Sequence, residues 1–275
     1  MQPSSRKSKS RLSYAKNDDP PFKKVLIRTL EVLTGQGRIQ RLYHEIYDMD
    51  LEPHHIWGAS LRQLEVELKY DQKALASIPK EGPLVFISNH PYGVLDGLIL
   101  GHLVSQVRPQ FFILVNELLL GEALLDGFLL PVSFEETKAA IHQNIHTKQE
   151  TIRRIKAGEA PAIFPGGGVA TAKNWWKGEA EELQWKRFTA KVIQQTKPTV
   201  VPLFFPGQNS RLFQLASKID AKLRLGLFIN EIRNKMGKEI EIKIGKPMSH
   251  TELSSIKNRQ DLLDHLQQQV MNLKP

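Results

Sequence analysis

The sequence predicts an α/β fold, in which a mostly parallel central sheet is flanked by helices and preceded by an N-terminal amphipathic helical hairpin. From Pro83 onward, short apolar runs alternate with longer stretches of helical periodicity. Three of these runs are almost wholly apolar: residues 84–88 (LVFIS), 111–115 (FFILV) and 199–205 (TVVPLFF). Such runs are typical of strands covered on both faces, as in parallel sheets with helices on each side.

The remaining elements follow in chain order. We expect helices at residues 98–107, 117–125, 137–156 and 188–196. We expect short strands at residues 129–132 and 162–164, and a more exposed, alternating strand at 239–244 (EIEIKI). A closing helix carries an apolar stripe made by Leu262, Leu263, Leu266, Val270 and Leu273. In such a fold, the loops at the strand ends carry function.

The chain ahead of this alternation has two parts. Residues 1–21 form a basic arm that ends at two prolines and is expected to be flexible. Residues 22–70 are predicted to form a helical, membrane-facing segment, and residues 71–275 the α/β domain. Apolar residues recur at helical steps in two stretches of the segment, at Phe22, Leu26, Leu30 and Leu33, and at Ile39, Leu42, Tyr43 and Ile46. A basic amphipathic helix lies in a bilayer interface or packs on its own domain, and the pattern is compatible with both.

The net charge of +9 is concentrated at the N-terminus. Residues 1–41 hold ten Lys and Arg against three acids, which is +7 of that total. A basic arm ahead of a nearly neutral domain indicates a polyanionic partner, either anionic lipid or nucleic acid.

Composition also excludes several classes of protein. The chain has no cysteine, which excludes disulfides, thiolate metal sites and cysteine nucleophiles and suits a reducing cytosol. No segment approaches the roughly 20 apolar residues that cross a bilayer, and the N-terminus lacks the apolar middle of a secretory signal. His142 and His146 are four residues apart, but no third ligand accompanies them, so no metal site is predicted. The chain is expected to be soluble or peripheral to a membrane.

The first site motif directly follows the strand at 84–88. Asn89, His90 and Gly93 lie in the loop, and Asp96 lies at the start of the next helix. Imidazole titrates near neutral pH and can take a proton from an attacking hydroxyl or amine. A carboxylate can orient the ring and stabilise the imidazolium, while an Asp at this place is also a common helix cap. The motif is compatible with a general base at His90 and a partner at Asp96.

The second motif is a glycine loop after the strand at 162–164. It comprises Pro165, Gly166, Gly167 and Gly168. Consecutive glycines let backbone N–H groups converge on an anion or an oxyanion. A dinucleotide fingerprint would need a third glycine where Thr171 stands, so that interpretation is weak.

A third loop follows the strand at 199–205. It offers the amide of Asn209, the hydroxyl of Ser210 and the guanidinium of Arg211. Arg211 can bind a phosphate or carboxylate through paired hydrogen bonds, or it can cap the loop. Between the second and third motifs, Trp175 and Trp176 stand among lysines in a pattern that favours a membrane interface over burial.

Taken in this order, the histidine-to-aspartate loop, the Phe-Pro-Gly loop and the Val-Pro strand resemble the glycerolipid (lysophosphatidic acid) acyltransferase superfamily. The stretch from FPGGGVATA to EIEIKIGKPM is similar to bacterial hemolysin-like lysophospholipid and lyso-ornithine lipid acyltransferases. The similarity covers about residues 22–250.

The resemblance implies transfer of a fatty acyl group from acyl-carrier protein (acyl-ACP) or acyl-CoA to a lyso-lipid, without a further cofactor. It implies His90 as general base, Asp96 as its partner, and substrate binding by Asn89, Gly93 and the glycine loop. The basic helices match the family's membrane-facing hairpin. We therefore expect a peripheral enzyme at the cytoplasmic face of a membrane, which is the inner membrane if the source is bacterial.

Two departures from the family pattern stand out. Five residues separate His90 from Asp96, where the family has four. The family motif Phe-Pro-Glu-Gly-Thr-Arg is replaced, with Gly166 at the glutamate position and no arginine nearby. Either Lys173 or Arg211 takes the place of that arginine, or the acceptor lacks a phosphate.

Two other functions stay open from the sequence. A neutral-lipid (mono- or diacylglycerol) acyltransferase shares the His-Pro-x-Gly and Pro-Gly-Gly patterns. A basic nucleic-acid-binding protein would explain the arm, but it leaves His90, Asp96 and the glycine loop without a role. We therefore expect a lipid surface as the partner and no nucleic acid.

Overall fold

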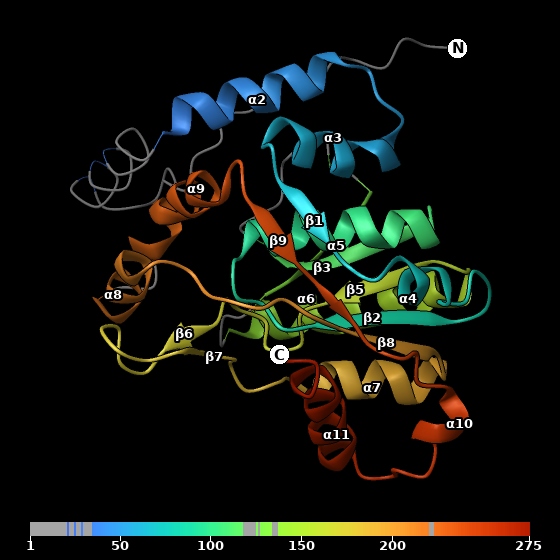
Figure 1. Cartoon of the computed structure of the whole chain (residues 1–275). Coiled ribbons are helices and arrows are strands. Elements are labelled where there is room, and N and C mark those ends of the chain that lie inside the picture. The colour runs from blue at the N-terminus through green and yellow to red at the C-terminus, as the bar shows by residue number, and fades with distance from the viewer. Residues whose placement is uncertain are drawn as a thin grey trace.

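The computed structural model describes residues 35–117, 125, 127–133, 137–219 and 223–275, together with the single positions 21, 25 and 29. At its centre is a six-stranded sheet with the order β10-β8-β2-β5-β3-β4 (Figure 1). The five strands from β8 to β4 run parallel, and β10 pairs antiparallel with β8. The mostly parallel α/β fold predicted from the sequence is therefore confirmed.

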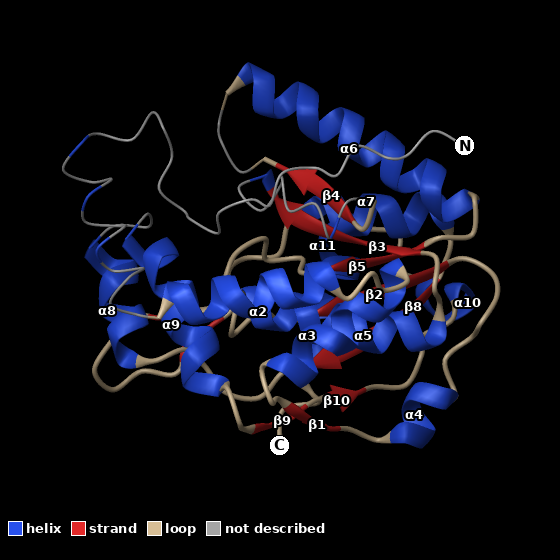
Figure 2. Cartoon of the chain, turned by 90° about the horizontal axis from the view of Figure 1, so that it is seen from above, coloured by secondary structure: helices blue, strands red, loops and turns tan. Residues whose placement is uncertain are grey.

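The bounds of the central strands agree closely with the apolar runs. They are β2 (Leu84–Ser88), β3 (Phe111–Asn116), β4 (Leu129–Val132), β5 (Ala160–Ile163), β8 (Thr199–Phe204) and β10 (Lys243–Ile244). Viewed from above, these strands lie side by side beneath the helices α3 (Ile56–Gln63) and α5 (Val94–Val107) (Figure 2). Helix α2 (Gln36–Asp48) lies over α3.

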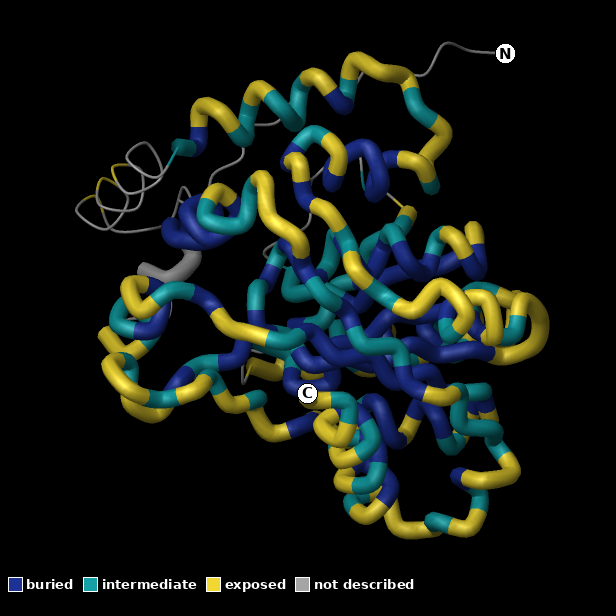
Figure 3. The backbone as a smooth tube through the Cα atoms, viewed as in Figure 1, coloured by how far each residue is buried: buried dark blue, intermediate teal, exposed yellow. Residues whose placement is uncertain are grey.

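The opposite face of the sheet is covered by a second set of helices. They are α6 (Lys138–Lys156), α7 (Arg187–Thr196) and α11 (Arg259–Met271). The pleat of β2 divides its side chains between the two layers. Leu84 and Phe86 join the cluster of α3 and α5, while Val85 and Ile87 join the cluster of α7 and α11. Figure 3 shows the sheet as the buried centre of the molecule. This double coverage explains why the strands are apolar throughout.

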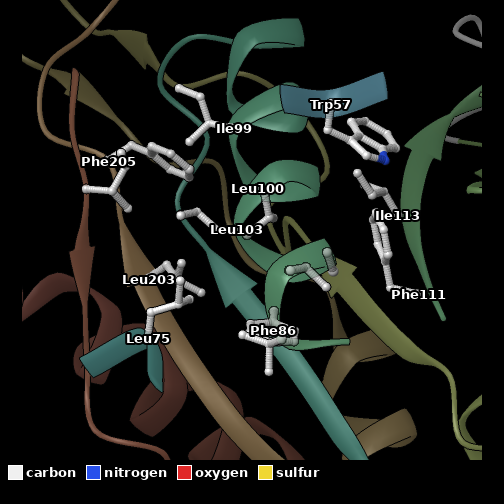
Figure 4. Close-up of a cluster of buried hydrophobic side chains, with 14 of the residues drawn as sticks. Trp57, Leu75, Phe86, Ile99, Leu100, Leu103, Phe111, Ile113, Leu203 and Phe205 are labelled. Carbon is white, nitrogen blue, oxygen red and sulfur yellow. The ribbon is translucent and has the colours of Figure 1, made fainter. Parts of the chain in front are cut away.

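Trp57 of α3 anchors the N-terminal segment to this core. Its side chain is 1% exposed and lies near Phe111 and Ile113 (Figure 4). The centre of its ring is 5.6 Å from those of both the Phe111 and Phe128 rings. Further along, β1 (Glu67–Lys69) pairs in parallel with β9 (Glu239–Glu241). The second half of the segment at 22–70 is thus built into the body of the domain.

The C-terminal alternating run differs from the expectation. The sequence predicts one strand over residues 239–244, but β9 belongs to the small sheet with β1 and β10 to the central sheet. Between them, the N–H of Ile242 donates to the carbonyl of Lys69 at 2.8 Å. The run is divided into two strands because β9 pairs with β1 and β10 pairs with β8. A local sequence pattern does not show which strand will be the neighbour.

The remaining elements include several that local patterns did not predict. These are η1 (Pro53–His55), α4 (Gln72–Ala76), β6 (Thr171–Ala172), β7 (Ala180–Glu181), α8 (Arg211–Ile219), α9 (Leu223–Lys235) and α10 (His250–Leu253). Helix α5 begins four residues before the predicted start at 98.

Three predictions concern residues that are largely not described. The basic arm lies outside the described residues, as do most of the first helix of the hairpin and most of the helix at 117–125. The second helix of the hairpin is confirmed as α2. None of the described helices is both long and apolar enough to cross a bilayer.

Two glycines of α5 provide a test of how α3 packs on the sheet. A Cβ at Gly101 would lie 2.3 Å from the Trp57 ring, whereas a Cβ at Gly97 would meet nothing within 4 Å. We expect Gly101→Ala to lower the free energy of unfolding by about 1–3 kcal/mol through overpacking. Gly97→Ala should raise it by up to about 1 kcal/mol, because alanine is the better helix former. Urea unfolding measures both, and equal effects would contradict the packing described.

Candidate active site

The site begins where β2 and β8 end side by side. The Asn89 side chain bonds both backbone groups of Phe205, donating from Nδ2 to the carbonyl at 2.9 Å and accepting the N–H at Oδ1 at 2.7 Å. Asn89 is buried, so these bonds are shielded from water. Asn89 was expected from the sequence to bind substrate. In the structure its side-chain amide joins the ends of the two strands, directly beside His90.

His90 and Asp96 are in contact, as the motif predicts. The distance between His90 Nδ1 and Asp96 Oδ2 is 3.0 Å. Oδ2 also accepts the N–H of Tyr92 at 2.7 Å and that of Gly93 at 2.9 Å. Asp96 is fully buried in the first turn of α5, where the helix dipole favours a negative charge. When Nδ1 donates to this carboxylate, the lone pair of the ring is left on Nε2.

The five-residue spacing is accommodated by the shape of the loop. Gly93 has a φ of 85°, in the region that favours glycine, and a Cβ there would lie 2.5 Å from the Phe228 ring. The Tyr92 hydroxyl donates to the carbonyl of Pro206, and Lys235 Nζ lies 4.5 Å from the centre of the Tyr92 ring. Burial, with a smaller effect from nearby Asp96, raises the pKa of Tyr92 to about 12. The phenol therefore stays protonated and keeps its bond to the loop at 206.

The glycine loop lies directly against the histidine. The Phe164 ring stacks on the His90 ring with their centres 4.0 Å apart. Gly167, with a φ of 74°, donates its N–H back to the carbonyl of Phe164 at 2.9 Å and closes a turn. Within the described chain, the N–H groups of Gly166 and Gly168 make no hydrogen bond. Of the three glycine amides, the described residues thus provide an internal partner for that of Gly167 alone.

Glu182 is part of the site, although no motif indicated it. It follows β7, and its Oε1 accepts the backbone N–H of His90 at 2.7 Å. Its Oε2 is buried and makes no hydrogen bond to the described residues. A Cβ on Gly166 would lie 3.2 Å from that oxygen, so the glycine leaves room for the carboxyl group. Burial raises the pKa of Glu182, an effect opposed in part by the His90 N–H.

His90 and the glycine loop form one wall of a cavity of about 870 Å³. Apolar side chains from α2, α3, β3 and β4 make most of the remaining wall, among them Leu42, Trp57, Ile113, Leu129 and Val132. Pro165, Gly166, Gly167, Gly168 and Gly93 all line it. The cavity thus joins the predicted base to a large apolar space, and its volume is within the range of roughly 300–1,000 Å³ for ligand sites.

In the third loop, the side chains of Asn209 and Ser210 contact Glu231 and Lys235 and do not line this cavity. Ser210 donates from its N–H to Glu231 Oε2 at 2.9 Å, and Asn209 accepts from Lys235 Nζ at 3.0 Å. Glu231 and Lys235 also pair with each other at 3.3 Å. Because Lys235 contacts Tyr92 as well, this buried network supports the loop that holds Asp96.

The two cations predicted to bind an acceptor are on the surface. Lys173 is exposed and pairs with Glu181 at 2.8 Å, and Arg211 lies over the Trp176 ring at 5.2 Å. Neither is among the residues that line the cavity. Their substrate-binding roles stay predictions. In the described part of the chain, no group of three or more His, Asp or Glu is placed to hold a metal ion.

The buried carboxyl group of Glu182 leads to a prediction on stability. Because its folded pKa is raised, the protein loses stability as pH rises from the ordinary value of 4.5 up to the raised value. Glu182→Gln keeps an acceptor for the His90 N–H and removes this loss. We expect the melting temperature of E182Q, relative to the unchanged protein, to rise over that pH interval and then level off. The exposed neighbour change Glu181→Gln is the control, and a pH-independent difference for E182Q would contradict the assignment.

Comparison with known proteins identifies the family. A protein-family model described as "Acyltransferase" matches residues 26–275. The chain is 27% identical over 195 residues to the lyso-glycine lipid O-acyltransferases of Phocaeicola vulgatus and Bacteroides thetaiotaomicron. The alignments cover 66% of this chain, and 65% and 67% of those proteins, respectively.

A solved structure supports the fold. The 1-acyl-sn-glycerophosphate (LPA) acyltransferase PlsC from Thermotoga maritima superposes with a TM-score of 0.50 at 11% identity. The match covers 90% of this chain and 94% of PlsC. Because the family model matches residues 26–275, the chain belongs to the acyltransferase family, and with the lyso-glycine lipid O-acyltransferase relatives it falls within the glycerolipid acyltransferase superfamily.

Proposed function

We propose that this protein transfers a fatty acyl group from acyl-ACP or acyl-CoA to a lyso-lipid at a membrane surface, with His90 as general base. One observation carries the proposal. A histidine oriented by a buried carboxylate lies in the wall of a large apolar cavity. A base next to a space suited to a hydrocarbon chain is what acyl transfer to a lipid requires.

The reaction needs only groups that the site offers. His90 Nε2 takes the proton of the acceptor hydroxyl or amine as that group attacks the thioester carbonyl carbon. The tetrahedral intermediate then collapses, the C–S bond breaks, and the thiolate takes the proton back from the imidazolium. Asp96 stabilises the imidazolium while it lasts. No covalent enzyme intermediate is needed.

The oxyanion of the intermediate needs hydrogen-bond donors. Gly166 and Gly168 provide two N–H groups without partners in the described chain, and both residues line the cavity beside His90. Gly167 serves a different purpose, because its N–H closes the turn. Backbone donors fixed in this way cost no reorganisation when charge develops.

The acceptor is inferred from the relatives and from the cavity. The two curated relatives act on a lyso-glycine lipid and transfer to oxygen, as their names state. We propose a lysophospholipid or a lyso-aminolipid as acceptor. A neutral mono- or diacylglycerol is the second candidate, favoured by the absence of an arginine from the glycine loop.

The membrane-facing side is proposed from exposed apolar side chains. Trp176, Leu212 and Ile219 are each more than half exposed, and Arg211 stacks on Trp176 among them. Amphipathic aromatics beside cations favour the headgroup region. Together with the basic arm and hairpin, this surface supports peripheral binding at the cytoplasmic face of a membrane. The nucleic-acid alternative explains the arm alone.

Substitution of His90 tests the mechanism. Thiol release from acyl-ACP or acyl-CoA would be followed with a panel of lyso-lipids in mixed micelles. We expect His90→Ala to lower kcat by about 10²–10⁴-fold, the typical contribution of a general base. Asp96→Asn should lower it by about 10²-fold or more, because the ring loses its orienting carboxylate.

The matched control is His142→Ala, an exposed histidine of α6 that does not line the cavity. It should retain full activity. Circular dichroism would verify that each variant is folded. Full activity in folded His90→Ala, or no turnover of any donor and acceptor by the unchanged protein, would overturn the proposal.

A further inference from the structure

The charges that line the cavity are very few. Among the described residues of its wall there is one cation, Lys186, and there is no Asp or Glu. All other groups are apolar or neutral, apart from His90. A ligand in this cavity therefore meets the positive charge of Lys186. The described wall contains no acidic side chain that would balance this charge.

The backbone of Lys186 is bonded to the first residue of the glycine loop. Its backbone N–H donates to the carbonyl of Pro165 at 2.9 Å. Pro165 directly follows Phe164, on whose ring His90 stacks. The lysine is thus held beside the glycine loop, and because it is exposed while lining the cavity, it lies at the opening. A lysine side chain is long and flexible enough to follow a headgroup there.

Lys186 also differs from several other lysines in having no acidic partner. Lys173 pairs with Glu181, Lys235 with Glu231, and Lys274 with Glu179. In the described structure, Lys186 takes part in no ion pair of this kind. An anionic group that binds at the edge of the cavity can therefore pair with this ammonium without competition from a described carboxylate.

We propose that Lys186 binds the anionic headgroup of the acceptor, a carboxylate or a phosphate, at the cavity opening. The inference rests on the proposed function and adds the acceptor's charge to it. Lys186 then takes the part that the sequence assigned to Lys173 or Arg211. The ion pair holds the headgroup outside while the acceptor's reacting hydroxyl lies near His90 and its hydrocarbon chain enters the cavity.

Acceptors that share one acyl chain but differ in headgroup provide the test. The panel contains a lyso-glycine lipid with a free carboxylate, lysophosphatidic acid and an uncharged monoacylglycerol. We expect Lys186→Met to raise KM about tenfold for the two anionic acceptors and to leave kcat unchanged. The reason is that the lost ion pair is made equally in the bound ground state and in the transition state. The monoacylglycerol should be unaffected. Lys186→Arg should keep the preference for anions, and Lys186→Glu should reverse it.

Lys191→Met is the matched control, an exposed lysine one turn along α7 that does not line the cavity. The donor is then varied at saturating acceptor, because CoA and acyl-carrier protein are acidic too. A rise in the donor KM with no change for the acceptors would overturn the inference in favour of donor binding. Equal losses for charged and uncharged acceptors would also overturn it.

The two proposals fail in different ways. If the unchanged protein turns over no lyso-lipid, the proposed function is wrong and the headgroup inference falls with it. If the unchanged protein is active and depends on His90, but Lys186→Met shows no headgroup discrimination, only the inference on Lys186 is wrong.

Discussion

The arrangement of the site depends on the buried carboxylate of Asp96. One of its oxygens accepts from the His90 ring and from the backbone of Tyr92 and Gly93, so a single atom fixes both the imidazole of His90 and its loop. Such a group is stable in the interior only while its donors stay in place. The surroundings ensure this, since the first turn of α5 favours its charge and the Tyr92 hydroxyl donates to the carbonyl of Pro206 and so ties the loop down.

Two buried polar groups hold the histidine from other sides. Asn89 joins the ends of β2 and β8 immediately before His90, and Glu182 accepts the His90 N–H from a segment that follows the glycine loop. The Phe164 ring covers one face of the imidazole. The His90 side chain is therefore positioned by strand ends and loops that are remote in sequence, and its geometry does not depend on one loop alone.

The N-terminal segment makes the cavity as well as a surface. Trp57 fixes α3 to the sheet, and α2 then lies over it, so that both helices supply apolar wall opposite the glycine loop. The segment at 22–70, which was predicted to face a membrane, thus also encloses the space beside His90.

The sequence by itself determined the five parallel strands of the central sheet and the proximity of His90 and Asp96, because these depend on local periodicity and on residues six apart. It also located the glycine loop. Only the tertiary structure revealed Glu182 and Lys186 in the site and directed Asn209 and Ser210 into a supporting network. Only it divided residues 239–244 between two sheets. These features arise from contacts between segments far apart in the chain, and a local pattern carries no information about which distant group will fill a given space.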